Sequence, residues 1–300
     1  MKTFYNLVAV IPVGPGCLPE FIEDTINSII HYTSSSYKII LVDDSQNDTG
    51  KRIKERIPAV EILCTPTSRG KLCGLYITLS HAFRHVISRY HFDALLRIDT
   101  DALIIGKAPE KEVIELFKTD STIGMAGQYP FDYAGNPWDI SWPKQQILKY
   151  TGSYKFFRNP LAHILLYKYH KQALSHGYKT GESVFGGACF FSESCLRKLE
   201  DAGLLPNTTF RNLNLEEDHL FSLLVKSVGL NFGDLSSGNL PFGCAWKGLP
   251  ASPRELYASG KKIIHSTRYW AHMNEADIRL YFKIKRNQQV TPRSSLSTNV

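Results

Sequence analysis

The chain has 300 residues, of which 43% are hydrophobic and 21% are charged, with a formal net charge of +7. This composition excludes a disordered or collagen-like chain, and the length allows a core that folds without disulfide or metal staples. Five basic residues and no acidic residue lie in residues 279–300, so the rest of the chain carries +2. We therefore expect no binding of nucleic acid, and peripheral membrane contact only through the basic C-terminal tail.

The six cysteines are scattered, and none of them forms a CxxC pair. Such cysteines are typical of buried thiols in a reducing compartment. The sequence shows no signal peptide and no apolar run of about 18 residues, so we predict no transmembrane segment. We expect a cytoplasmic protein that contacts, at most, the inner face of a membrane.

The first hundred residues alternate between short apolar runs and amphipathic stretches. Strands are predicted at residues 7–13, 37–42, 60–64 and 94–98, and helices at residues 20–31, 48–56 and 71–90. This alternation predicts an α/β fold with a Rossmann-like, mainly parallel sheet and helices on both faces.

The pattern changes after residue 106. Residues 127–150 are rich in aromatic and turn-forming residues, and residues 184–192 read as a strand region centred on two glycines. Helices are predicted at residues 160–175, 193–202 and 215–228. From about residue 288 the apolar periodicity ends, and we expect disorder there.

Polar or flexible residues follow three of the four predicted strands. Pro12 and Val13 end the first strand, Asp43 begins an Asp-Asp pair after the second, and Asp99 and Asp101 follow the fourth. Ligands of open parallel sheets bind beyond these strand ends. Carboxylates gathered there repel one another unless a cation compensates, and Mg²⁺ or Mn²⁺ takes one or two carboxylates together with phosphate oxygens. The alternative is an acidic turn that caps the next element.

Four segments have the order and spacing of a known family: VAVIPVGPG, IILVDDSQNDTG, TSRGKLCGLYITLSHAF and ALLRIDTDALIIG. They resemble the nucleotide-binding half of GT-A-fold glycosyltransferases, most closely family 2, and cover about the first 105 residues. The resemblance implies a metal-dependent enzyme that moves a sugar from a nucleotide diphosphate sugar, in the first place a UDP-sugar, to an acceptor hydroxyl. The metal would be Mn²⁺ or Mg²⁺.

The resemblance also implies roles for individual residues of the first half. Pro12 and Val13 would lie beside the nucleoside, Asp43 or Asp44 would contact the uracil or ribose, and Arg69, Gly70 and Lys71 would cover the base and diphosphate. Asp99 and Asp101 would form the metal-binding DxD motif, with Asp101 the principal ligand.

Parts of the second half fit the same family. Gly186 and Gly187 resemble the segment that lines the donor-sugar and acceptor site, although a glycine-containing bulge in a strand is the alternative. Asp218, or else Glu217, would be the general base of an inverting reaction, unless these acids only favour the start of a helix. His265 is a candidate third metal ligand or an ordinary histidine.

Three further side chains are candidates on chemistry alone. Lys261 and Arg268 could neutralise the diphosphate. Trp142 could stack on a sugar ring, or could be an ordinary core aromatic.

The resemblance divides the chain into two halves of one domain and a tail. Residues 1–105 would bind the nucleotide sugar, residues 106–285 would form the acceptor-binding half, and residues 286–300 would be a basic, disordered tail. The acceptor would be a glycan, a lipid-linked sugar or a protein.

Three other classes of protein stay open. A NAD-dependent oxidoreductase would use the Gly14-x-Gly16 pattern and Asp43, but Pro19 stands where that fingerprint needs a small residue,. A sugar nucleotidyltransferase would need a basic, glycine-rich first loop, which has no Lys or Arg before Lys38. The third class is a non-catalytic protein that binds nucleotide sugars on the same fold.

Overall fold

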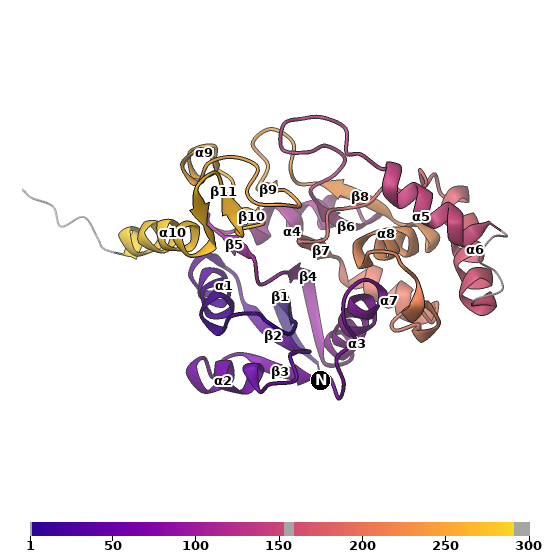
Figure 1. Ribbon diagram of the computed structural model, residues 1–300, viewed down its shortest axis with the longest axis horizontal. Coiled ribbons are helices and arrows are strands. Elements are labelled where there is room, and N and C mark those ends of the chain that lie inside the picture. Colours follow the sequence, from indigo (N-terminus) through magenta and orange to yellow (C-terminus); the bar gives the residue numbers. More distant parts are fainter. Residues whose placement is uncertain (1, 153–158, 291–300) are drawn as a thin grey trace, which may run out of the picture.

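The computed structural model of the chain describes residues 2–152 and 159–290, and its centre is a seven-stranded sheet (Figure 1). The strand order across the sheet is β3 (Glu61–Cys64), β2 (Tyr37–Asp43), β1 (Thr3–Val13), β4 (Tyr90–Ile98), β7 (Ala188–Phe191), β6 (Ile123–Gly127) and β8 (Asn231–Asp234). Strand β7 runs antiparallel to both of its neighbours, and the other pairs are parallel. The predicted α/β class with a mainly parallel sheet is confirmed.

Helices cover both faces of the sheet because its central strands are apolar on both sides. In β1, Leu7, Ala9 and Ile11 pack on the face of α1 (Pro19–Tyr32) and α2 (Thr49–Arg56). Val8 and Val10 pack on the opposite face, which is covered by α3 (Cys73–Arg89), α7 (Glu193–Asp201) and α8 (Glu217–Ser227). Side chains alternate along a strand, so one apolar run serves both layers.

The second half adds three pieces that the sequence did not predict. A small sheet joins β5 (Ala102–Ile104), β10 (Ile263–His265) and β9 (Phe242–Cys244), and β11 (Tyr269–Trp270) pairs with β12 (Met273–Asn274). The added helices are α4 (Glu110–Thr119), α5 (Ser141–Thr151), α9 (Pro253–Ala258) and α10 (Glu275–Val290), with the short η2 (Thr208–Asn212). The small sheet matters for function, since it sets His265 of β10 opposite Ala102 of β5.

Two predicted features of the second half differ from the structure. The glycine pair lies in a turn before β7, which begins only at Ala188, so the interpretation as a bulge within a strand is wrong. The aromatic-rich segment holds a helix, α5, whose buried side chains Pro143, Ile147 and Tyr150 recur at helical spacing. The helix of residues 160–175 is confirmed as α6 (Pro160–Ser175).

The C-terminal segment is more ordered than the sequence indicates. Helix α10 continues to Val290, and within it Arg286 is buried and paired with Asp24 of α1. Arg279 is also buried, 3.2 Å from Asp24 and 2.8 Å from Glu275. The expected start of a disordered tail at residue 286 is therefore wrong, and two of the five C-terminal bases hold the fold together. Residues 291–300 lie outside the described residues.

Candidate active site

The carboxyl end of β4 meets the small sheet at the predicted DxD motif. The backbone N–H of Asp99 donates to the carbonyl of Gly187 at 2.9 Å, which ties the motif to the turn before β7. Strand β5 begins directly after Asp101, and β10 pairs with β5 in antiparallel register. Residues 99, 101 and 265 therefore meet through strand pairing, although 164 positions separate Asp101 from His265.

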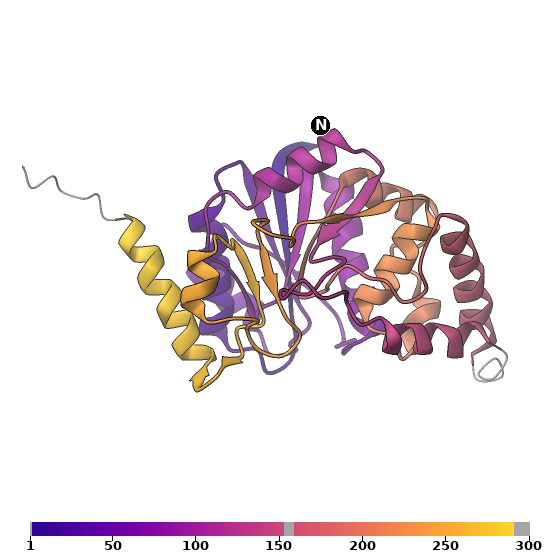
Figure 2. The ribbon, with the colours of Figure 1, turned by 90° about the horizontal axis from the view of Figure 1, so that it is seen from above.

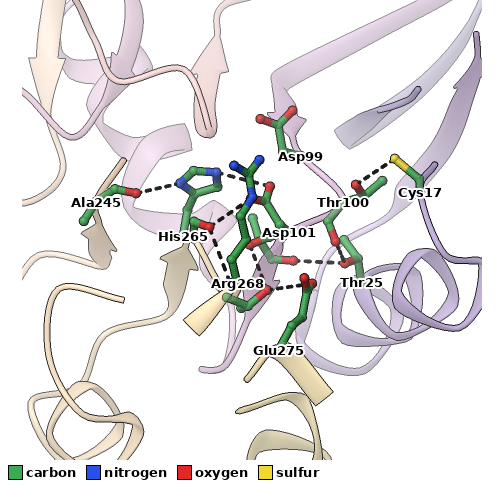
Figure 3. Close-up of polar contacts among 12 residues, drawn as sticks. Cys17, Thr25, Asp99, Thr100, Asp101, Ala245, His265, Arg268 and Glu275 are labelled. Carbon is green, nitrogen blue, oxygen red and sulfur yellow. Dashed lines mark hydrogen bonds and ion pairs between the residues drawn. The ribbon is translucent and has the colours of Figure 1, made fainter. Parts of the chain in front are cut away.

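Asp99, Asp101 and His265 form a cluster in which one ligand atom from each lies within 4.8 Å of the others. Figure 3 shows His265 between Asp101 and the carbonyl of Ala245. The Nδ1 of His265 lies 3.0 Å from that carbonyl and Nε2 lies 3.2 Å from Oδ1 of Asp101. Because Nδ1 donates to Ala245, Nε2 is the nitrogen presented to the carboxylates, as in a metal-binding histidine. Two carboxylates and one imidazole fit Mn²⁺, and the sequence-predicted ligand set thus comes together.

Asp101 is held as a carboxylate by its surroundings. The Ser266 hydroxyl donates to Oδ2 at 2.9 Å, and Nε of Arg268 lies 2.8 Å from the same oxygen. Burial raises the pKa of Asp101, but the hydrogen bonds from His265 and Ser266 and the charge of Arg268 outweigh burial and lower it,. The side chain of Arg268 is 63% exposed, so it is the partner of Asp101 that faces solvent.

A buried arginine, which the sequence reading missed, connects the metal ligands to the acids of α8. One nitrogen of Arg97, Nη2, lies 2.9 Å from Asp99 and 2.7 Å from Glu217. Its Nε and Nη1 have no hydrogen-bond partner among the described residues. Burial raises the pKa of both Asp99 and Glu217, and the charge of Arg97 opposes that rise,. The sequence does contain a signal for this ion pair, because a charged residue inside the apolar run 94–98 requires a partner of opposite charge.

The glycine pair separates Asp218 from His265. The backbone N–H of Gly186 donates to Oδ2 of Asp218 at 3.1 Å. A Cβ on Gly186 would lie 2.7 Å from the Cβ of Asp218, and a Cβ on Gly187 would lie 2.5 Å from the ring of His265. Both positions require glycine because functional side chains approach them closely. The structure thus places Asp218 next to the predicted metal ligands.

The predicted nucleotide-binding residues lie at the ends of the neighbouring strands. Val13 accepts a hydrogen bond from the backbone N–H of Asp44 at 2.8 Å, so Pro12 and Val13 lie beside the Asp-Asp pair. Asp43 accepts from the N–H groups of Gly50 and Ser45, which fixes the start of α2. These partners give Asp43 a structural role, and its contact with a nucleoside stays a prediction.

Asp44 holds the loop that precedes α3. Its carboxylate accepts from the Ser68 hydroxyl at 2.8 Å and from the backbone N–H of Arg69 at 3.1 Å. Gly70 adopts a left-handed φ of 74°, and Lys71 beside it is exposed. The loop therefore presents these residues at the same edge of the sheet, on the side of β2 and β3.

The structure buries Lys261 and exposes Trp142, the two remaining candidates. Lys261 is buried, and its Nζ donates to the carbonyls of residues 236, 238 and 240, so its predicted role at the diphosphate is wrong. The sequence could not show this, because those carbonyls lie more than twenty positions away. Trp142 is half-exposed, and its ring centroid lies 5.9 Å from that of His219, the residue after Asp218.

Comparisons with known proteins find structural similarity to glycosyltransferases. The mannosyltransferase PcManGT from Pyrobaculum calidifontis, solved with GDP-Man and Mn²⁺, aligns with 78% of this chain at 14% identity and a TM-score of 0.46. TarS residues 1–349 from S. aureus align with all of this chain and 76% of that structure, at 13% identity and a TM-score of 0.48. Galactosyltransferase LgtC, solved with donor and acceptor sugar analogues, aligns with 96% of this chain and 98% of its own, at 9% identity and a TM-score of 0.49.

At the sequence level, no protein-family model matches the chain. A 96-residue stretch, 32% of the chain, is 30% identical to human E3 ubiquitin-protein ligase SHPRH. The chain spans 55% of the length of PcManGT and 6% of that of SHPRH. Within residues 2–152 and 159–290, no helix is both long enough and apolar enough to cross a bilayer.

Proposed function

We propose that the chain is a metal-dependent glycosyltransferase that moves a sugar from a nucleotide diphosphate sugar, in the first place a UDP-sugar, to an acceptor hydroxyl. One observation carries the proposal. The carboxyl end of β4 holds a cluster of two carboxylates and an imidazole, and a further carboxylate, Asp218, lies one glycine pair away. A charge-stabilised leaving group and a separate base are the two requirements of this reaction.

Asp99, Asp101 and His265 would hold the cation, which is Mn²⁺ or Mg²⁺. When bound, the cation supplies positive charge to the departing diphosphate. Arg268 is exposed and contacts Asp101, so its guanidinium would be placed to pair with a phosphate oxygen of the donor,. Pro12, Val13 and the loop of Arg69, Gly70 and Lys71 would hold the nucleoside and diphosphate.

Asp218 is our choice for the general base of an inverting transfer. Glu217, the alternative, is buried against Arg97, so its carboxylate is already occupied. Asp218 is only partly buried, and each of its oxygens accepts one backbone N–H, from Gly186 at 3.1 Å and from His219 at 2.8 Å. These two hydrogen bonds orient the carboxylate, and a remaining lone pair would remove the proton from the acceptor hydroxyl as the new C–O bond forms, an effect worth about 10²–10⁴-fold in rate.

The acceptor would be a glycan, a lipid-linked sugar or a protein. A cytoplasmic setting also belongs to the proposal. It is supported by the six cysteines, all of which are free thiols in the described part of the chain,.

The test is a thermal-shift screen of UDP, GDP, ADP and NADH with and without Mn²⁺, followed by assays of sugar release from the donor that binds. We expect Mn²⁺-dependent stabilisation by a nucleoside diphosphate, about 2.7 kcal/mol at a hundredfold excess over Kd. Asp101→Asn should lose that stabilisation, whereas Asp218→Asn should keep it and lose sugar transfer. Stabilisation by NADH without Mn²⁺ would contradict the proposal, and unchanged turnover in Asp218→Asn would remove the assigned base.

A further inference from the structure

Besides the C-terminal residues, a second segment of the chain is strongly basic, and the proposed function does not use its charges. Residues 140–181 contain seven Lys and Arg residues and no Asp or Glu. The segment therefore carries as much charge as the net excess of +7 of the whole chain. It contains α5 and α6, two helices that pack against each other. A long segment without any acidic residue attracts anionic surfaces, because it carries no negative charge that would repel them.

Helix α6 exposes a continuous face that is both apolar and basic. Leu161 is 57% exposed and Ile164 is 53% exposed, and the helical repeat places four further exposed side chains beside them. These are Tyr167, Lys168, Lys171 and Leu174. At 3.6 residues per turn the six lie within an arc of about 140°. The opposite face of α6 is buried in the core through Ala162, Leu166 and Ala173.

We propose that this face of α6, which we call the α6 face, docks on the surface of an anionic lipid bilayer. The apolar side chains would enter the boundary between head groups and acyl chains, and the lysines would reach the anionic head groups. The Nζ of Lys171 lies 5.6 Å from the ring centroid of Tyr167, so a basic group and an aromatic group lie side by side on this face. Charge selects the lipid as the occupant, because a second copy of the chain would bring its own Lys168 and Lys171 against the same two lysines of this face,.

The C-terminal helix is the rival surface, and the structure favours α6 over it. Helix α10 exposes Leu280 and Ile284 next to Lys283, but its first turn carries Glu275 and Asp277. The two helices lie at opposite ends of the molecule (Figures 1 and 2), so one flat membrane would not engage both in the same way. The proposal therefore moves membrane contact from the C-terminal tail to α6.

The α6 face is joined to the candidate active site through α5. Trp142 in the first turn of α5 lies against His219, which follows Asp218. If the proposed glycosyl transfer holds, a docked membrane would present its own components as acceptors on the side of the site where Asp218 lies. Membrane docking itself does not depend on that function, because it uses none of the site residues.

The experiment is co-sedimentation of the full chain with vesicles of phosphatidylcholine alone or with one quarter phosphatidylglycerol, at 50 and 500 mM salt. We expect binding to the anionic vesicles that weakens at high salt. Lys168→Gln/Lys171→Gln should weaken it by about 25-fold, at about fivefold for each lysine. Leu161→Ser/Ile164→Ser should weaken it by roughly tenfold even at low salt. All four residues are exposed, so melting temperatures should not change,.

The matched control is Lys283→Gln/Ile284→Ser on α10, which should bind as the wild type does. Docking on α6 is overturned if this control loses as much binding as the α6 variants, or if neither α6 variant loses any. It is also overturned if sedimentation equilibrium without lipid shows a dimer that Leu161→Ser/Ile164→Ser dissociates. Loss of vesicle binding with intact nucleotide binding separates this proposal from the proposed function.

Discussion

Replacing Gly187 with alanine is expected to disturb the metal cluster through His265. The new Cβ would lie 2.5 Å from Cγ and Cδ2 of the imidazole, about 1 Å nearer than carbon atoms pack,. Either the ring or the turn must move by that amount, and a 1 Å shift breaks the 3.0 Å hydrogen bond from Nδ1 to Ala245,. Overpacking of this kind costs about 1–3 kcal/mol of stability, and misorienting a ligand lowers metal affinity about 10–100-fold.

The assay is a titration with Mn²⁺ monitored by electron paramagnetic resonance of the free ion. Gly186→Ala is the informative comparison, because its Cβ meets Asp218 instead. It should keep Mn²⁺ affinity and lose turnover. Gly14→Ala is the neutral control, since no described atom lies within 4 Å of its Cβ position. Wild-type Mn²⁺ affinity in Gly187→Ala would refute the idea that the glycine makes room for a metal-binding histidine.

Three further changes have expected outcomes. Arg97→Met leaves Glu217 buried without its cation and should cost about 3–5 kcal/mol in urea unfolding, part of which a second change, Glu217→Gln, should restore,. Arg286→Ala removes a buried ion pair and should lower thermal stability by about 1–3 kcal/mol, whereas a disordered residue would give no change,. Burial opposes ionisation of Glu61, but hydrogen bonds led by that from Tyr90 lower its pKa to about 2. Because Glu61 is only partly buried, solvent screens part of this effect, and the wild type should lose about 1–2 kcal/mol as the pH falls from 4.5 to 2, whereas Glu61→Gln should lose less over this range in acid unfolding,.

The sequence predicts the first half of the fold well because local patterns determine it. The apolar run 7–13 is buried on both faces as β1, and the motif at Asp99 and Asp101 lies at a strand end as predicted. Helix α3 begins and ends within two residues of its predicted bounds. In this half β1 pairs with β2 and β2 pairs with β3, each across a single crossover helix, so local pattern and tertiary structure agree there, and only β4 returns over a longer distance to pair with β1,.

The second half depends on partners far away in the chain, which no local pattern reveals. Lys261 reads as a phosphate-binding cation but is occupied by three backbone carbonyls. Arg286 reads as a solvated base but pairs with Asp24, 262 positions earlier. His265 could be predicted only from resemblance, and pairing of β10 with β5 places it beside Asp101. Arg97, in β4 of the first half, differs from these residues, because a charge within a buried strand can be seen in the sequence.

The most direct measurement is the anomalous scattering of manganese in crystals soaked with Mn²⁺ and uridine diphosphate. We expect one peak coordinated by Asp99, Asp101 and Nε2 of His265, with diphosphate oxygens on its open side and Arg268 withdrawn from Asp101. Density for uridine diphosphate elsewhere, or an intact Arg268–Asp101 ion pair with no anomalous peak at the cluster, would contradict the proposed role of this site.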